Sequence, residues 1–271
     1  MSTTNNVAND KAEFGILKVA AAQESWSVEK VVAAEFPIAP KENTESPVPF
    51  FHMLERLKTT KREGWRRFGI DRGESISDHM YRMSLITMFA PESLASKINI
   101  PHCTKMALVH DMAEALVGDI TPVDGVPKSE KNRRESTTMD YFTKSLLGRV
   151  NGALTGQKIM DIWQEYEDSV TLESKFVHDV DKIELILQMV EYERSKPQLD
   201  LGEFSWVATK IVLPEVQAWA DEILKEREEF WAGKKHIKYT DVTKPDEKKV
   251  AQADEYYGGK ENESTSMNGE A

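Results

Sequence analysis

The chain has 271 residues, of which 40% are hydrophobic, so it is long enough to bury a sizeable core without cross-links. Its 46 acidic and 35 basic residues give a net charge of −11, which argues against a general nucleic-acid coat and against binding to anionic membranes. The single cysteine, Cys103, excludes an internal disulfide and any zinc site that needs two thiolates. A metal ion must therefore be held by His, Asp and Glu side chains.

The sequence also carries information on location. No apolar run approaches the ~20 residues of a membrane span, and the N-terminal residues lack a basic flank followed by a hydrophobic signal core. We therefore expect a protein of the cytoplasm, or of the cytoplasm and nucleus, that contacts no membrane.

Composition divides the chain into three parts. Residues 1–45 begin with a polar stretch and end in a linker, so we expect a partly disordered extension with one short helix or docked segment between Phe14 and Phe36. Residues 46–231 hold nearly all the large apolar side chains and form the predicted domain. Residues 232–271 are rich in Lys, Asp and Glu, which predicts a flexible charged tail.

Apolar residues of the predicted domain recur at helical spacing almost throughout. No run alternates with a period of two for long enough to propose a sheet, so the predicted fold class is all-α, a single helical bundle. In chain order, helices are expected over residues 50–57, 80–89, 106–117, 139–147, 159–166, 176–190 and 206–230, the last broken near Pro214. Two prolines and a glycine make residues 121–127 a loop.

The neighbouring residues His110 and Asp111 stand out in an otherwise apolar predicted helix. Glu114 lies one helical turn beyond His110, on a neighbouring face. Burying an imidazole beside two carboxylates is costly unless a cation or hydrogen bonds compensate. A metal site is one interpretation, and a core histidine bonded to a carboxylate is the other.

Two further positions favour the metal site. His79 lies on the inward stripe of its helix, and Asp181 stands one residue from the apolar stripe of a long helix. Asp181 alone could equally belong to a solvated acidic face, and His178, three residues earlier, is a rival ligand. Two imidazoles and two carboxylates suit an ion such as Mn, Co, Fe or Zn and leave positions for water and substrate. The set is His79, His110, Asp111 and Asp181.

The order of these residues resembles the H…HD…D signature of the HD-domain metal-dependent phosphohydrolases. The resemblance is closest to the subgroup of HD domain-containing protein 2 and the bacterial 5′-deoxynucleotidases, and it extends over residues 48–230. Three segments carry it, residues 77–83 (SDHMYRM), 110–122 (HDMAEALVGDITP) and 180–184 (VDKIE).

This resemblance implies an HD-domain helical bundle, usually a homodimer, that hydrolyses deoxyribonucleoside 5′-monophosphates to deoxynucleoside and phosphate. It implies that the four residues above bind Mn, Co or a similar ion. Glu114 and Asp119 match acidic positions implicated in catalysis and, with the backbone oxygen of Ile120, in holding a second cation such as Mg. Glu114 is placed to orient or deprotonate a water. Asp119 could bind a second ion, protonate the leaving 5′-oxygen or contact the sugar, and the sequence does not choose among these roles.

Because the chain is acidic overall, a phosphate group of the substrate must be bound by locally clustered basic side chains. Residues 51–75 and 128–134 each carry more basic than acidic side chains, and arginine suits phosphate through its planar fork. Trp65 offers a ring face for a base or sugar, although a tryptophan is more often part of a core. The bacterial enzymes carry an arginine directly before the matching tryptophan, where this chain has Gly64. The remaining phosphate-binding candidates are Arg62, Arg66 and Arg67.

We therefore predict a metal-dependent phosphomonoesterase whose partner is a deoxynucleoside monophosphate and not a nucleic-acid polymer. One alternative is the same metal site acting on another phosphoester, such as a cyclic nucleotide or an alarmone. The absence of an appended signalling domain favours the small monophosphate. The other alternative is a non-catalytic, metal-stabilised module that binds a partner, and the acids Glu114 and Asp119 count against it.

Overall fold

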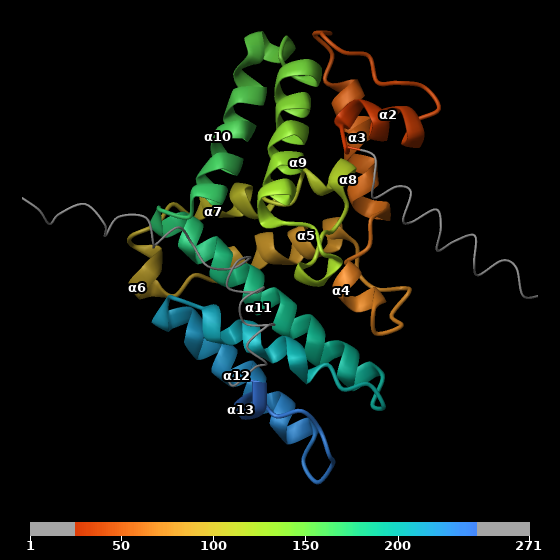
Figure 1. Cartoon of the computed structure of the whole chain (residues 1–271). Coiled ribbons are helices and arrows are strands. Elements are labelled where there is room, and N and C mark those ends of the chain that lie inside the picture. The colour runs from red at the N-terminus through yellow and green to blue at the C-terminus, as the bar shows by residue number, and fades with distance from the viewer. Residues whose placement is uncertain (1–24, 243–271) are drawn as a thin grey trace, which may run out of the picture. The chain divides into compact units, whose positions relative to one another are not determined.

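The computed structural model describes residues 25–242 (Figure 1). The chain divides into two units, residues 1–39 and 40–271. The described part of the first unit contains helix α2 (Val28–Glu35), and the Ser27 side chain caps it by accepting a hydrogen bond from the backbone of Lys30. A short helix therefore lies within the segment where one was expected. Residues 14–24 of that segment lie outside the described residues.

The described residues of the second unit are helical, with one isolated bridge between Lys61 and Ser75 and no strand. The predicted all-α class is confirmed. In chain order the α-helices are α3 (Val48–Thr59), α4 (Glu63–Arg66), α5 (Ile76–Ile86), α6 (Glu92–Ala95), α7 (Ile100–Ala107), α8 (Glu114–Val117), α9 (Lys128–Asp140), α10 (Leu154–Asp168), α11 (Leu172–Ser195), α12 (Pro214–Phe230) and α13 (Tyr239–Val242). One segment is a π-helix, η3 (Tyr141–Leu146). The 3₁₀ helices are η1 (Thr87–Phe89), η2 (Pro122–Asp124), η4 (Val150–Ala153) and η5 (Gly202–Lys210).

Helix α11 is the centre of this unit. It packs against α5, α7, α10, α12 and η5, so apolar side chains on several of its faces are buried (Figure 1). Phe176, Val180, Ile183 and Ile186 are among them. Removing this apolar surface from water is the main stabilising contribution of the helix. Polar residues on the same helix are thereby held at the middle of the bundle.

The prediction of one continuous helix over residues 106–117 is wrong. Helix α7 ends at Ala107 and α8 begins at Glu114, and the turns between them are tightened. The amides of Met112 and Glu114 donate to the carbonyl oxygens of Val109 and Asp111, each over 3.0 Å, which is the three-residue spacing of a 3₁₀ helix. Because residues three apart eclipse at this spacing, Glu114 is aligned with Asp111 instead of with His110.

The break predicted near Pro214 is confirmed, since η5 ends at Lys210 and α12 starts at Pro214. Residues 232–242, placed in the tail by composition, contact the bundle. Arg227 donates to the carbonyl oxygen of Ile237 over 2.7 Å, and the Ile237 amide donates to Asp200 over 2.6 Å. The domain boundary at residue 231 stays a prediction, and residues 243–271 lie outside the described residues.

A membrane crossing was not expected. None of the helices in residues 25–242 has the length and apolar character that a bilayer span requires.

Candidate metal and catalytic site

His79 is positioned by the first turn of α5. The Ser75 side chain accepts from the Asp78 amide, and Asp78 accepts from the Ser75 amide, which forms a capping box that starts the helix. His79 follows directly and is fully buried. Its Nε2 lies 3.2 Å from Oδ1 of Asp181 on α11 and 3.7 Å from Oδ2 of Asp111.

His110 and Asp111 come from the tightened turns between α7 and α8. The Nδ1 atom of His110 lies 3.0 Å from the carbonyl oxygen of Ala107, so Nδ1 donates and Nε2 is the atom left for a ligand. That Nε2 lies 3.2 Å from Oδ2 of Asp111. The ring packs against His79 and Tyr166, with centroid separations of 5.5 and 4.9 Å.

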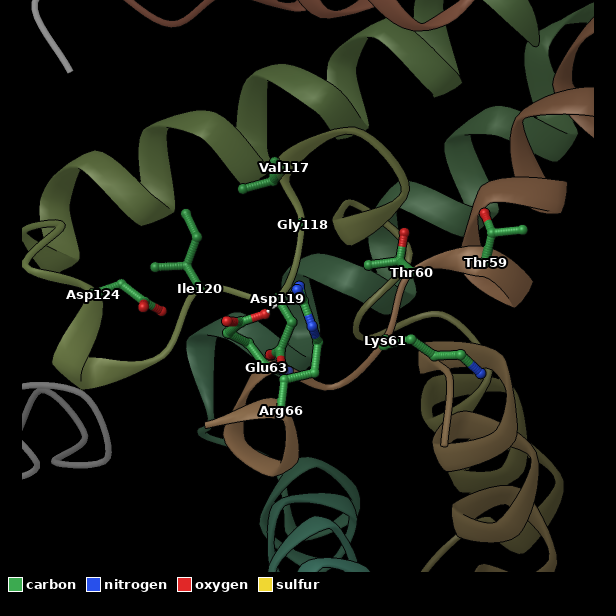
Figure 2. A pocket seen from close by; sticks show the side chains of 10 residues that line it. All are labelled: Thr59, Thr60, Lys61, Glu63, Arg66, Val117, Gly118, Asp119, Ile120 and Asp124. Carbon is green, nitrogen blue, oxygen red and sulfur yellow. Dashed lines mark hydrogen bonds and ion pairs between the residues drawn. The ribbon is translucent and has the colours of Figure 1, made fainter. Parts of the chain in front are cut away.

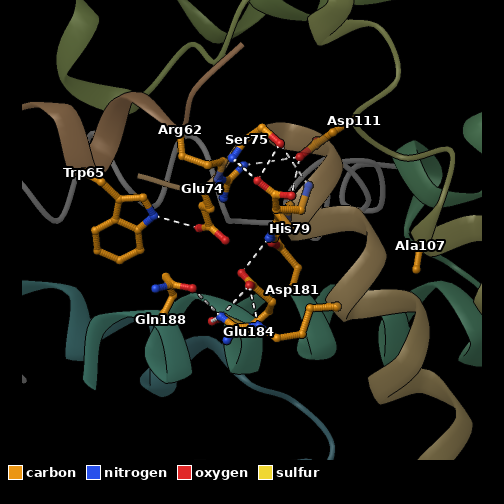
Figure 3. A network of polar contacts seen from close by, with 12 residues as sticks. Arg62, Trp65, Glu74, Ser75, His79, Ala107, Asp111, Asp181, Glu184 and Gln188 are labelled. Carbon is orange, nitrogen blue, oxygen red and sulfur yellow. Dashed lines mark hydrogen bonds and ion pairs between the residues drawn. The ribbon is translucent and has the colours of Figure 1, made fainter. Parts of the chain in front are cut away.

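The structure brings the four predicted metal ligands together from three separate segments. Figure 3 shows three of them, His79, Asp111 and Asp181. Ligand atoms of His79, His110 and Asp111 lie within 4.8 Å of one another. The Nε2 atoms of both histidines are buried and make no hydrogen bond. Buried polar atoms without a hydrogen bond are rare and require a partner. Two such nitrogens facing two carboxylates form a donor set that fits a divalent cation.

Electrostatics also favour a cation at this cluster. Burial alone would raise the pKa of Asp111, but His110 and Arg62 lower it well below its usual range. The pKa of Asp181 is lowered likewise by His79, against the opposing effect of burial. Burial and Arg62 lower the pKa of His79, but Glu184 and Asp181 outweigh them and raise it to about 10. The two aspartates are therefore ionised and attract positive charge.

Glu114 lies beside this cluster at the start of α8. It is buried, and its Oε2 has no hydrogen-bond partner. Burial, followed by the charges of Asp111 and Asp119, raises its pKa well above the ordinary value. A buried carboxylate with an elevated pKa is suited to accept a proton.

Asp119 lies on the loop that follows α8. Gly118 ends that helix with φ of +79°, a conformation that a residue with a side chain rarely adopts, and so turns the chain toward the site. One carboxylate oxygen of Asp119 accepts from the Glu63 amide over 2.5 Å, and the other lies 3.7 Å from Arg62 Nη1. Within residues 25–242, neither cluster with metal-ligand spacing includes Glu114 or Asp119, so the second cation site stays a prediction.

A cavity of about 580 Å³ adjoins Asp119 (Figure 2). Its walls come from the end of α3, the following chain and α4 on one side, and from the end of α8 and the loop after it on the other; they include Lys61, Glu63, Arg66 and Ile120. This volume is in the range of small-molecule sites.

Arg62 connects this cavity with the metal cluster. Its Nη1 lies 3.3 Å from Asp111 Oδ2 and 3.7 Å from Asp119 Oδ1, and only 15% of its side chain is exposed. Arg66 and Arg67 are exposed, and Arg66 pairs with Glu63 over 2.9 Å. Of the three candidate arginines, Arg62 is the one that contacts a proposed metal ligand.

Trp65 lies in the core. Its ring is 3% exposed and packs against Tyr192 and Phe204, with centroids 5.3 and 4.7 Å away, while its Nε1 donates to Glu74 over 2.7 Å. A Cβ atom added at Gly64 would lie 3.6 Å from the Phe204 ring. The position directly before Trp65 therefore faces this aromatic group. In this arrangement Trp65 meets the polar network through its nitrogen and not through an open ring face.

His178, the rival ligand, faces α10. Its Nε2 lies 3.0 Å from the carbonyl oxygen of Tyr166, and the two rings stack at 3.9 Å. Asp181, three residues later, is the member of this segment that meets His79.

Glu184 and Arg82 lie within the motif segments 180–184 and 77–83, but the sequence assigned them no role in the site. Glu184 is fully buried and lies 2.6 Å from Nδ1 of His79, and Arg82 lies 2.6 Å from Glu184. Spacing in the sequence could have pointed to Glu184. It follows Asp181 by three residues on the same predicted helix, so the two side chains lie near each other. Only the packing of α5 on α11 shows which atom each carboxylate meets.

Comparison with known proteins identifies the fold family. A profile of the HD domain matches residues 54–219, a span that contains all four clustered residues. The chain belongs to the HD-domain family. The 5′-deoxynucleotidase hdd1 of Schizosaccharomyces pombe is 48% identical to this HD-domain chain over 188 residues, covering 69% of this chain and 93% of that protein. The 5′-deoxynucleotidase YBR242W of Saccharomyces cerevisiae is 37% identical over 235 residues, covering 84% and 96%.

A solved structure is also similar to this HD domain. The HD domain-containing protein YGK1 aligns with a TM-score of 0.56 and 30% identity. The alignment covers 76% of this chain and 99% of that one. YGK1 of Saccharomyces cerevisiae is itself named a 5′-deoxynucleotidase.

Proposed function

We propose that this HD-domain protein is a 5′-deoxynucleotidase that hydrolyses deoxyribonucleoside 5′-monophosphates to deoxynucleoside and phosphate. The observation that carries the proposal is the convergence of two buried imidazole nitrogens without hydrogen bonds on two ionised aspartates. Relatives named 5′-deoxynucleotidases, aligned over 93% and 96% of their own lengths, support the substrate class.

The cation is proposed to be held by His79, His110, Asp111 and Asp181. A bound divalent cation supplies a water of lowered pKa and positive charge for phosphate oxygens. Mn or Co is the proposed ion because the family resemblance implies it, and the mixed nitrogen and oxygen donor set is compatible with either. Mg is the proposed ion for a second site at Glu114, Asp119 and the backbone oxygen of Ile120.

The remaining residues have separable roles. Glu114, buried beside Asp111, orients the attacking water and accepts its proton. Arg62 directs its guanidinium group between Asp111 and Asp119, where it binds phosphate oxygens through paired hydrogen bonds. Asp119, on the cavity wall, contacts the sugar or the leaving 5′-oxygen. The cavity beside it receives the nucleoside.

A second copy of the chain is the proposed partner, as the family resemblance implies. Exposed apolar side chains along α5 and η1 support it, because an exposed apolar patch favours association with another protein surface. They are Tyr81, Leu85, Met88 and Phe89. Light scattering of the purified protein should give twice the chain mass, and a monomer would contradict the proposal. The cytoplasm, with or without the nucleus, stays the proposed location.

The function is tested with purified protein and a panel of nucleotides. In the presence of Mn or Co, we expect phosphate release from dAMP, dGMP or dTMP in preference to the ribose forms. His110→Ala and Asp111→Ala should abolish release. Release that survives either substitution would exclude the metal assignment, whereas turnover of a cyclic nucleotide alone would exclude the substrate class.

Glu114→Gln tests the catalytic role separately from cation binding. We expect a loss of about 10²-fold or more in kcat, since general bases contribute on that order, with the cation of the histidine and aspartate site retained. Glu130→Gln is the control, because Glu130 pairs with Arg133 and Arg134 at the surface. Unchanged kcat in Glu114→Gln, or loss of the cation held by the histidines and aspartates, would contradict the assigned role.

A further inference from the structure

Two buried side chains of the site, His79 and Glu184, are in contact. Both side chains are fully buried, and Nδ1 of His79 lies 2.6 Å from Oε2 of Glu184. An ionised carboxylate only accepts hydrogen bonds, so Nδ1 carries the proton. When a cation displaces the proton of Nε2, that nitrogen presents a lone pair, and Nε2 is the atom that faces Asp111 and Asp181.

His110 reaches the same tautomer by a different route. Its Nδ1 donates to the backbone carbonyl oxygen of Ala107 over 3.0 Å. A carbonyl is also purely an acceptor, so Nε2 is again the ligand atom. The two imidazoles therefore present equivalent nitrogens, one oriented by the main chain and the other by Glu184.

Arg82 occupies the other oxygen of the Glu184 carboxylate. Its Nε and Nη2 lie 2.8 and 2.6 Å from Oε1, so the carboxylate is divided between Arg82 and His79. Rotation of the carboxylate would break at least one charge-assisted hydrogen bond. Arg82 also donates to Gln188, one turn further along α11, over 2.9 Å. These contacts connect α5 to α11 at the height of the metal cluster (Figure 3).

We propose that Glu184, held by Arg82, is the positioning residue for His79 and sets the affinity of the site for its cation. The inference rests on the proposed function and adds to its metal site a residue that touches neither cation nor substrate. Carboxylates that accept from a ligating histidine orient the ring and raise its basicity.

A cation seated among Glu74, His79 and Glu184 is the competing interpretation, since their ligand atoms lie within 4.8 Å. Two contacts disfavour it. The 2.6 Å hydrogen bond already uses Nδ1 of His79, and the guanidinium of Arg82 lies against Glu184. A second positive charge there would be repelled by Arg82.

The test is cation affinity of the full-length protein, measured on metal-free samples by calorimetric titration with Mn or by competition with a chelator. Glu184→Gln preserves size but removes the charge, and we expect about 10- to 100-fold weaker binding. Glu191→Gln is the matched control. Glu191 also pairs with Arg82 over 2.6 Å from the same helix, but it is half exposed, and no contact joins it to His79. Its affinity should equal that of the unaltered protein.

Additional readouts separate positioning from general stability. The thermal unfolding of metal-free Glu184→Gln should show a folded protein, and the visible spectrum of bound Co should change because His79 is no longer oriented. Saturating cation should restore the activity of Glu184→Gln but not of His79→Ala. If Glu184→Gln does not fold, Arg82→Gln tests the same contact and should weaken binding in the same direction.

The outcomes are distinct. Unchanged affinity in folded Glu184→Gln overturns the inference, and so does loss of one of two bound ions, which would assign Glu184 to a cation site of its own. An unaltered protein that binds no cation overturns it too. Since titration requires no turnover, weakened binding supports the role of Glu184 even if no deoxynucleotide is hydrolysed.

Discussion

Three polar residues within one turn of α11 contact three different parts of the chain. Successive polar side chains of a helix point about 100° apart, so each meets a different element. His178 faces Tyr166 on α10, and Asp179 accepts hydrogen bonds from the backbone at Val212 before α12. Asp181 faces His79 on α5. Of these three, only Asp181 belongs to the proposed metal site, and the distinction depends on which helix lies on each face.

Partly buried His178 predicts a pH dependence of stability. Burial, then Lys182, lowers its pKa from 6.5 to about 4. Above pH 6.5 the residue is neutral in the folded and unfolded chain and contributes no dependence. Between pH 6.5 and 4 the unfolded chain binds a proton that the folded one does not, so the free energy of unfolding decreases, by at most about 3–4 kcal/mol at 1.36 kcal/mol per pKa unit.

The check is a comparison with His178→Gln, which does not titrate and still offers an N–H to the carbonyl oxygen of Tyr166. Unfolding temperatures of both metal-free proteins are measured from pH 7.5 to 4.5. The unaltered protein should lose more stability toward low pH than the variant. Parallel curves would show that His178 is not buried in the neutral form.

At the scale of elements, the site depends on helix ends and tightened turns. Asp111 and Glu114 are aligned because the chain from Leu108 to Ala113 forms three-residue turns, and Gly118 then ends α8. The start of α12 is secured similarly, since both backbone amides before Pro214 donate to the buried carboxylate of Asp179. Leu213 is the N-cap of the helix and Val212 precedes it, so Asp179 fixes the chain at the point where α12 begins.

Asp179→Ala should therefore lower stability by about 1–3 kcal/mol, because it removes the charged acceptor of the partly buried amide hydrogen bonds of Val212 and Leu213. Asp179→Asn keeps an acceptor oxygen and should lose less. Denaturant unfolding gives the free energies, and titration with Mn should find the cation site intact in both. A stable Asp179→Ala with weakened cation binding would instead place Asp179 in the metal site.

For the whole second unit, a buried ion pair joins distant parts of the chain. Arg227 on α12 is fully buried and donates to Glu193 on α11 over 2.9 and 3.0 Å. The same guanidinium reaches Asp200 and the carbonyl oxygen of Ile237. It thus attaches residues 232–242 to the bundle, which composition alone had assigned to the tail.

Arg227→Ala should cost about 3–5 kcal/mol of stability, because it leaves Glu193 buried without its cation. The matched control is Arg194→Ala. Arg194 pairs with Glu226 between the same two helices at 2.8 Å, but both side chains are about half exposed, so the loss should stay below about 1 kcal/mol. Equal losses in the two variants, measured by denaturant unfolding, would contradict the energetic role of burial.

The sequence by itself determined the all-α class, the break at Pro214 and the residue types of the candidate site. Apolar periodicity reports which face of a helix is buried, and short motifs mark histidines and carboxylates that are costly to bury alone. His79 could be placed on an inward stripe for this reason. The basic segment 51–75 could be identified by charge, but not the arginine within it that meets the cluster.

Only the tertiary structure decided which side-chain atoms of the candidate site contact one another. Glu184 contacts His79 across 105 residues, and Arg62 contacts Asp111 across 49, through packing that no local pattern records. Trp65 became a core residue because Tyr192 and Phe204 cover its ring. The tightened turns around His110 likewise depend on hydrogen bonds between specific backbone atoms. Periodicity determines burial along one helix, whereas the partner of a buried polar atom is set by how separate helices pack.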